Sequence, residues 1–468
     1  MKFLIIKILL VFSLIILMVG CSTYNTKSLS YQKKLLNGNT DGALKELEKN
    51  KFLQKKKNKL LYYLEKGKTE YLNGQYAESN VSLNLADNYL EDYKTTNVNR
   101  FFGVVTNPEN KPYMGEDFEK VTIHYYKALN YIFLNQPDDA LVEAKRINLQ
   151  LQRLNDSYKS GKENRYNTDA FAINLQGLIY ELIGETNNAF ISYRNAVDLY
   201  YNHNNLYYGV SCPEQLKKDL LRISKKLGFT NDHLFYKEKF GGNFEDSQKS
   251  EGGEVVIFWE NGMVPYKSQT YYTFSILPGK ELGYLMVQNE ELGISLPIPI
   301  GENDEKRDFT DLSVFNLAYP KYVQRPPNYS NASAAINGQS FDFELTEDYN
   351  NIAIQTLKER SSKELGEAAL RLAAKKISEL AIKEENEYIG VVVGLFNAIN
   401  EHAETRNWQS LPNNIQYARI PLKIGENNIE LHFVNQQGQS DQRIMNVIGT
   451  GKLQIEKVIT LDSKLPNY

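Results

Sequence analysis

The first half of the chain carries apolar residues at the three- and four-residue spacing of helices. The clearest stretch is DAFAINLQGLIYELIGETNNAFISYRNAVDLY, residues 169–200. It predicts two antiparallel helices joined by a short turn. Gly184 lies between the two apolar patterns, and glycine accepts the left-handed conformation that commonly ends a helix. The pattern therefore indicates a helical hairpin.

Two earlier segments, residues 59–89 and 121–151, repeat this hairpin. Their turn residues, Gly74 and Asn135, lie seven residues after a small residue of the first helix, as Gly184 does. Small residues let two helices cross closely, and tyrosines beside them are expected to fill the remaining space. The positions predicted to pack the repeats are Gly67, Ala86, Ala128, Tyr131, Ala140, Gly177, Tyr180, Ala189, Tyr193 and Ala196. Three copies in register are typical of a tetratricopeptide-like (TPR-like) array.

The array is expected to occupy residues 21–232, with unevenly spaced repeats and a further helix at 214–228. Residues 233–253 are then predicted to be a linker. They include the polar, glycine-rich stretch GGNFEDSQKSEGG, which gives way to a different hydrophobic pattern.

From residue 254 the apolar residues alternate with polar ones, or run together in short stretches, as in strands. EVVIFWE, residues 254–260, predicts a strand, and Asn261-Gly262 predicts a tight hairpin turn after it. Residues 254–345 are expected to form the first part of a β-rich, sandwich-like domain. Residues 346–411 then predict a helical insertion with one apolar stripe.

Residues 412–468 return to the strand pattern and are expected to complete the sheet that begins at Glu254. Pairing the two sets of strands would cover their edges and bury apolar side chains of both in one core. The residues expected in that core are Val255, Ile257, Ile420 and Leu422. The predicted fold is therefore a multidomain α + β chain, with a TPR-like helical array followed by a split β-rich domain.

The amino terminus has the layout of a lipoprotein signal peptide. Residues 1–20 start with lysines, continue as an unbroken apolar run and end at Gly20, before Cys21. The run alone could also be an uncleaved membrane anchor. A small residue before cysteine favours cleavage and lipidation of Cys21, and Ser22 after it favours the outer membrane, facing the periplasm.

Composition fits an exported protein without cofactors. The net charge of −3 becomes −5 when the two lysines of the signal peptide are removed. Once Cys21 carries lipid, Cys212 has no partner for a disulfide within the chain. Export and the lack of a basic patch argue against nucleic acid as a partner. The expected partners are the membrane, through the lipid, and an unidentified envelope protein or peptide.

The sequence favours a protein that is not an enzyme. The five histidines show no zinc-ligand spacing such as HExxH, and no GxSxG or phosphate-binding loop follows a predicted strand. Arg406 is expected to pair with acidic residues at a helix end. Trp259 and Trp408 could stack on sugar rings or be buried at the seam of the β-rich domain.

Taken with the repeats, the stretches VVIFWENGMVPYKS (255–268) and TRNWQSLPNNIQYARI (405–420) resemble a poorly characterised family of TPR-containing bacterial lipoproteins. The resemblance extends to lipoproteins of the penicillin-binding-protein activator kind, and implies a role in envelope or peptidoglycan assembly. Two functions follow as expectations. One is a scaffold whose helical groove binds a protein or peptide. The alternative is a glycan-binding or glycan-processing module in the β-rich domain.

Overall fold

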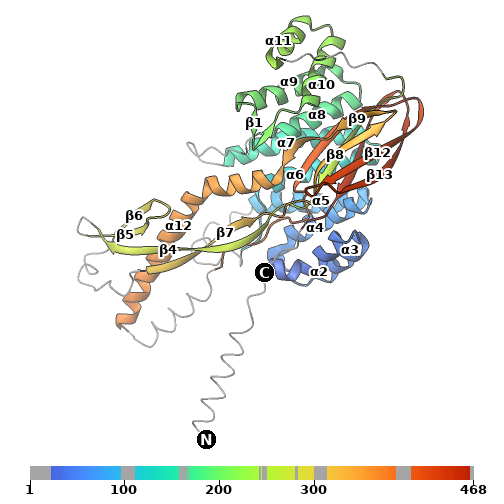
Figure 1. The fold of residues 1–468 in the computed structure, drawn as a ribbon. Helices are drawn as coiled ribbons and strands as arrows, with labels where there is room; N and C mark the ends of the chain where they lie inside the picture. The colour runs from blue at the N-terminus through green and yellow to red at the C-terminus, as the bar shows by residue number, and fades with distance from the viewer. Residues whose placement is uncertain are drawn as a thin grey trace.

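The computed structural model describes residues 23–95, 111–157, 166, 168–241, 244, 250–279, 283–299, 314–385 and 402–463. The expected signal peptide and Cys21 lie outside these residues. In Figure 1 the helical array and the β-strands lie side by side, and one strand-and-helix arm extends away from both.

The described helices before residue 241 pair into five hairpins. They are α2 (Tyr24–Leu36) with α3 (Thr40–Lys49), α4 (Lys59–Leu72) with α5 (Tyr76–Thr95), α6 (Asp117–Phe133) with α7 (Pro137–Ser157), α8 (Ala170–Leu182) with α9 (Thr186–Asn202), and α10 (Glu214–Lys226) with α11 (Thr230–Phe240). The predicted end of the array at residue 232 is wrong, because α11 continues to Phe240. It stops at Gly241, whose φ of +63° is left-handed.

The helices of the repeats cross closely at their glycines. A Cβ atom on Gly177 would lie 2.5 Å from the ring of Tyr193, and one on Gly67 would lie 2.8 Å from the side chain of Leu83. The predicted alanine positions are all fully buried: Ala86, Ala128, Ala140, Ala189 and Ala196. Tyr131 and Tyr180, expected in the same packing, are only partly buried. Tyr180 instead faces the preceding hairpin, where the Lys145 Nζ lies 5.6 Å from its ring centre.

The central sheet joins strands from both sides of the helical insertion. Its order is β10 (Glu344–Asp348), β11 (Asn414–Pro421), β3 (Gly253–Asn261) and β14 (Lys452–Thr460). β3 is antiparallel to β11, with Val255 opposite Ile420, and parallel to β14. The first β segment therefore ends at Asp348 rather than at residue 345.

A second sheet packs on one face of the central sheet. Its order is β13 (Ser440–Gly449), β12 (Gly425–Asn435), β8 (Tyr329–Ile336) and β9 (Gln339–Asp342). Val255, Ile257, Ile420 and Leu422 share one core with Ile429, Leu431 and Phe433 of this sheet. The two sheets thus form a sandwich.

The remaining strands form a separate arm. The sheet order is β6 (Ile294–Pro299), β5 (Tyr284–Asn289), β4 (Tyr266–Pro278) and β7 (Val314–Val323). Helix α12 (Tyr349–Glu385) covers one face of this sheet with an apolar stripe that includes Leu365, Ala369 and Leu372. Residues 254–345, expected to form the first part of one β-rich domain, are thus divided between the sandwich and this arm, and α12 packs on the sheet of the arm.

The predicted hairpin at Asn261-Gly262 is also wrong. Gly262 has a φ of +64°, but β3 and β4 belong to different sheets. The backbone N–H of Gly262 donates instead to the carbonyl of Thr460, at the end of β14. Residues 402–411, assigned to the helical insertion from the sequence, contain no helix in the structure.

Candidate functional site: the inner face of the helical array

The first helix of every hairpin faces the rest of the chain. These helices, α2, α4, α6, α8 and α10, form what we call the inner face of the array. Strand β3 lies against it with Val256 and Phe258, while the alternate residues Val255, Ile257 and Trp259 point into the sandwich. Alternate side chains of a strand point to opposite faces, so a strand covered on both sides reads as a continuous apolar run. This accounts for the sequence VVIFW.

A buried ion pair joins the inner face to the central sheet. Lys68 of α4 pairs with Glu260 of β3, and neither side chain is more than 2% exposed. Tyr71 also donates to Glu260, at 3.0 Å, and Lys457 of β14 lies 3.4 Å from the ring centre of Tyr71. Burial lowers the pKa of Lys68 to about 8, which Glu260 partly opposes, and that of Lys457 to about 7.

A second charged contact lies further along the array. Arg419 of β11 pairs with Glu181 of α8 at 2.8 Å, with Asp219 of α10 at 3.0 Å and with Glu254 of β3 at 2.6 Å. Arg222 also pairs with Glu181, at 2.7 Å. The two guanidinium groups hold the pKa of Glu181 below its usual range against the opposing effect of burial. Because the network joins two helices and two strands, it holds the array to the sheet.

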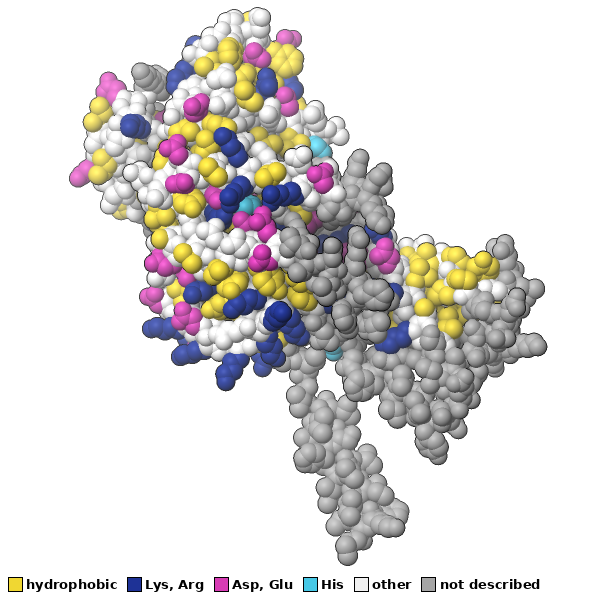
Figure 2. Space-filling view, turned by 180° about the vertical axis from the view of Figure 1, so that it is seen from behind, with side chains coloured by type: hydrophobic (Ala, Val, Ile, Leu, Met, Phe, Trp, Pro, Cys, Tyr) yellow, Lys and Arg dark blue, Asp and Glu magenta, His cyan; other side chains and the backbone are white. Residues whose placement is uncertain are grey.

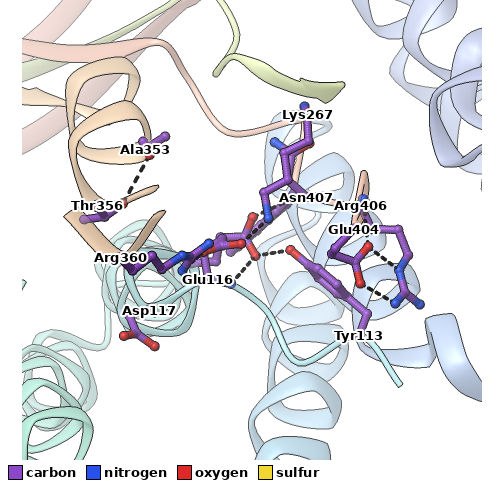
Figure 3. A network of polar contacts seen from close by, with 12 residues as sticks. Tyr113, Glu116, Asp117, Lys267, Ala353, Thr356, Arg360, Glu404, Arg406 and Asn407 are labelled. Carbon is purple, nitrogen blue, oxygen red and sulfur yellow. Dashed lines mark hydrogen bonds and ion pairs between the residues drawn. The ribbon is translucent and has the colours of Figure 1, made fainter. Parts of the chain in front are cut away.

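A third network holds the arm (Figure 3). Glu116, at the start of α6, pairs with Lys267 of β4 and, at 2.6 Å, with Arg360 of α12. One turn further, Glu119 accepts hydrogen bonds from Tyr113 and from the backbone N–H groups of Glu116 and Trp408. Burial, with Glu116 nearby, raises the pKa of Glu119 to about 7. The two carboxylates therefore differ in protonation near neutral pH.

Residues 402–411 fill the space between the array and the sheets. Trp408 is fully buried, with its ring 5.9 Å from Tyr126 of α6. Arg406 is 2% exposed and hydrogen-bonds to Glu404 and to the side chain of Asn58. The expected pairing of Arg406 with an acidic neighbour is therefore present, although at an irregular segment and not at a helix end.

Neither tryptophan is placed to stack on a sugar. Trp259 is fully buried in the sandwich and donates from Nε1 to the hydroxyl of Thr460 at 2.9 Å. Trp408 lies in the other core, so the two do not share a seam. Burial at both positions removes the residues on which the glycan alternative rested.

The inner face is thus occupied by the chain itself. Contacts to it come from strands β3, β11 and β14, from residues 402–411 and from Tyr349 at the start of α12. The expectation that a partner binds in this groove is wrong for the part of the chain that the structure describes. The linker predicted at residues 233–253 suggested that the array and the β-rich domain are separable units. In the structure the array and the central sheet share one hydrophobic core.

The outer face of the array carries a feature that the sequence analysis missed. Each hairpin turns at a residue with positive φ: Gly38, Gly74, Asn135, Gly184 and Gly228. Seven residues after these, on α3, α5, α7, α9 and α11, lie Lys45, Val81, Val142, Ile191 and Phe235. The four apolar side chains are 61%, 50%, 37% and 58% exposed, in chain order. We call these four residues the outer-face row.

Figure 2 shows hydrophobic side chains recurring along the array between charged ones. Single exposed apolar side chains are common on soluble proteins, but these four recur at one position of successive repeats. The row could have been found from the sequence, by counting from the turn residues of the repeats.

The described residues contain no group of three His, Cys, Asp or Glu placed to hold a metal ion. Burial raises the pKa of the Cys212 thiol to about 12, which leaves it protonated and unreactive. An open cavity of about 910 Å³ with a mixed polar and apolar lining lies beside α2, lined in part by Lys33, Leu36, Asn328 and Gln437.

Among the helices that the structure describes, none is long and apolar enough to cross a membrane.

No protein-family model and no curated protein matches the chain. Solved structures match the helical part. MamA aligns with a TM-score of 0.28 and 16% identity over 45% of this chain and 91% of its own. The apo form of RapI aligns with a TM-score of 0.34 and 14% identity over 50% of this chain and 58% of its own. Aspartyl phosphate phosphatase F from Bacillus subtilis aligns with a TM-score of 0.31 and 15% identity over 46% of this chain and 48% of its own.

Proposed function

We propose that this chain is a membrane-anchored lipoprotein of the cell envelope that acts as a non-catalytic scaffold for other proteins. The observation that carries the scaffold role is the outer-face row. Four apolar side chains at one repeat position are exposed, although each residue type favours burial by about 1.5–3 kcal/mol per side chain. Covering them with another protein gains the part of that free energy that belongs to their exposed surface. The described residues of the inner face are covered by the chain itself.

The anchor is part of the proposal. Its support is the sequence of residues 1–20 and the cysteine that follows. Acyl chains, such as palmitate, on Cys21 would hold the protein on the outer membrane, facing the periplasm. Several acyl chains anchor a protein stably, whereas a single one binds the membrane only reversibly. The partners are then the membrane and an envelope protein or peptide, with no nucleic acid involved.

The anchor is tested by Cys21→Ala. The variant is expected to lose lipid labelling and to leave the outer-membrane fraction, because the thiol is the group that takes the lipid. A Cys212→Ala variant is the control and should fractionate like the parent. Persistence of the Cys21→Ala variant in the outer membrane would show that another segment anchors the chain.

The scaffold role is tested by a photo-crosslinking amino acid placed at Val142 in living cells. Ile444 on β13 is the matched control, since it is apolar and 66% exposed but lies outside the row. We expect defined cross-linked proteins from position 142 and none from position 444. Equal, diffuse products at both positions would argue against a binding surface on the outer face.

A further inference from the structure

We propose that the outer-face row is covered by the same row of a second copy of this chain, about a twofold axis that runs along the array. The proposal rests on the scaffold function proposed above, because it identifies the protein that binds the outer-face row.

The flanking residues one turn before and one turn after the row have opposite character. On α7, Asp139 lies four residues after the turn residue and Arg146 lies eleven residues after it. On α11 the same two positions hold Asp232 and Lys239. On α9 they hold Asn188 and Asn195, whose amides can both donate and accept. On α7 and α11 the row is therefore bordered by an acidic group on one side and a basic group on the other.

A twofold axis along the row brings these borders together. It places each of these helices antiparallel to its own copy. Position four, three residues before the row, then lies opposite position eleven, four residues after it. Asp139 of one copy then faces Arg146 of the other, and Asp232 faces Lys239. An axis across the row would instead place acidic border on acidic border, which is repulsive. Charge complementarity thus favours a second copy as the partner, and favours the axis along the row over the axis across it.

Helix α5 departs from the charge pattern, because it holds Glu78 and Leu85 at positions four and eleven. Leu85 takes the position held by Arg146 on α7, and it is 43% exposed. It widens the apolar row at that point. Arg146 pairs with Glu143 at 3.3 Å and approaches Asp87 to 3.8 Å, yet its side chain is 48% exposed. A further carboxylate can therefore reach its open side.

The orientation also fits two anchored chains. An axis along the array keeps both first hairpins, α2 with α3, at the same end of the dimer. Lipids on the two Cys21 residues would then enter one membrane. A self-complementary patch used by both copies is the usual arrangement of a closed dimer.

The oligomeric state of the mature chain, with Cys21 replaced by serine, tests the proposal in analytical ultracentrifugation. We expect a dimer for the parent. Val142→Lys and Ile191→Lys should give monomers, because each buries a charge in the contact, while Ile444→Lys should leave the dimer intact. Circular dichroism melts should show all variants folded, since the changed side chains are exposed.

Exchanging the charges at Asp139 and Arg146 distinguishes pairing with a second copy from binding to another protein. Asp139→Arg and Arg146→Asp should each weaken the dimer about tenfold or more, as like charges then face each other. The double variant should recover it, because both copies carry the exchanged pair. Failure of the double variant to recover would overturn the orientation. A parent that is monomeric at every concentration would overturn the proposal that a second copy covers the row. In that case, defined cross-links from Val142 to other proteins would still support the scaffold function.

Discussion

Lys68 of α4 and Glu260 of β3 form an ion pair in the shared core of the helical array and the central sheet, with side chains 0% and 2% exposed. The partners are 192 positions apart in the chain. Lys457 of β14 approaches the same site without a carboxylate of its own, stacked on Tyr71. One carboxylate thus stabilises a buried site that holds two amines.

Glu260→Gln is expected to lower the free energy of unfolding by about 3–5 kcal/mol, because it leaves buried amines without their counter-charge. The cost should fall as the pH rises towards 8, the pKa of Lys68, since without Glu260 the amines release their protons at lower pH. Urea unfolding at several pH values measures this. Glu91→Gln, which breaks an exposed pair with Arg153, is the control and should cost about 0–1 kcal/mol.

Gly177→Ala is expected to destabilise the array by about 1–3 kcal/mol through overpacking. The added Cβ meets the Tyr193 ring, which cannot turn aside freely because its hydroxyl donates to Glu181 at 2.9 Å. Gly67→Ala should cost less, since Leu83 can change rotamer. Adding Tyr193→Leu to Gly177→Ala copies the Gly67 site, so the double variant should lose less stability than the sum of the two single losses. Additive losses would mean that the ring is not the obstacle.

Glu119→Gln is expected to change the pH dependence of stability. The folded carboxyl has a pKa of about 7 against 4.5 for the unfolded one, so the folded state binds more protons between these values. Parent stability should therefore fall, relative to the variant, as pH rises from 4.5 to 7, by at most about 1.4 kcal/mol per pH unit. Thermal or urea unfolding of both proteins across that range measures the difference, and a flat difference contradicts the assignment.

Residues 23–241 alone are expected not to fold cooperatively. Without the central sheet, Tyr126, Phe171 and Lys68 of the inner face would enter water or remain without partners. The fragment should bind a hydrophobic dye and be digested quickly, whereas the mature chain resists. A protease-resistant fragment ending near Gly241 would show that the array is an independent domain after all.

Local features of the fold could be predicted from the sequence. The turn at Gly184, the close crossing at Gly177 and the strand at Val255–Trp259 depend on residues near in the chain, whose conformational preferences are local. The joining of the two sets of strands, with Val255 and Ile420 in one core, followed from edges that needed covering. Repeats in the first half indicated helical hairpins. The first and last hairpins went unrecognised as repeats because Tyr31 and Leu221 stand where the others have a small residue in the first helix.

Only the tertiary structure decided which surfaces meet. An apolar run shows that a strand is covered on both faces, but not that helices cover one face and a second sheet the other. Trp259 and Trp408 look alike in sequence, yet they lie in different cores. The groove expected to bind a partner is filled by β3 and residues 402–411, and the exposed apolar side chains lie on the opposite face. Periodicity reports which side of an element is apolar; what packs against that side depends on contacts between residues hundreds of positions apart.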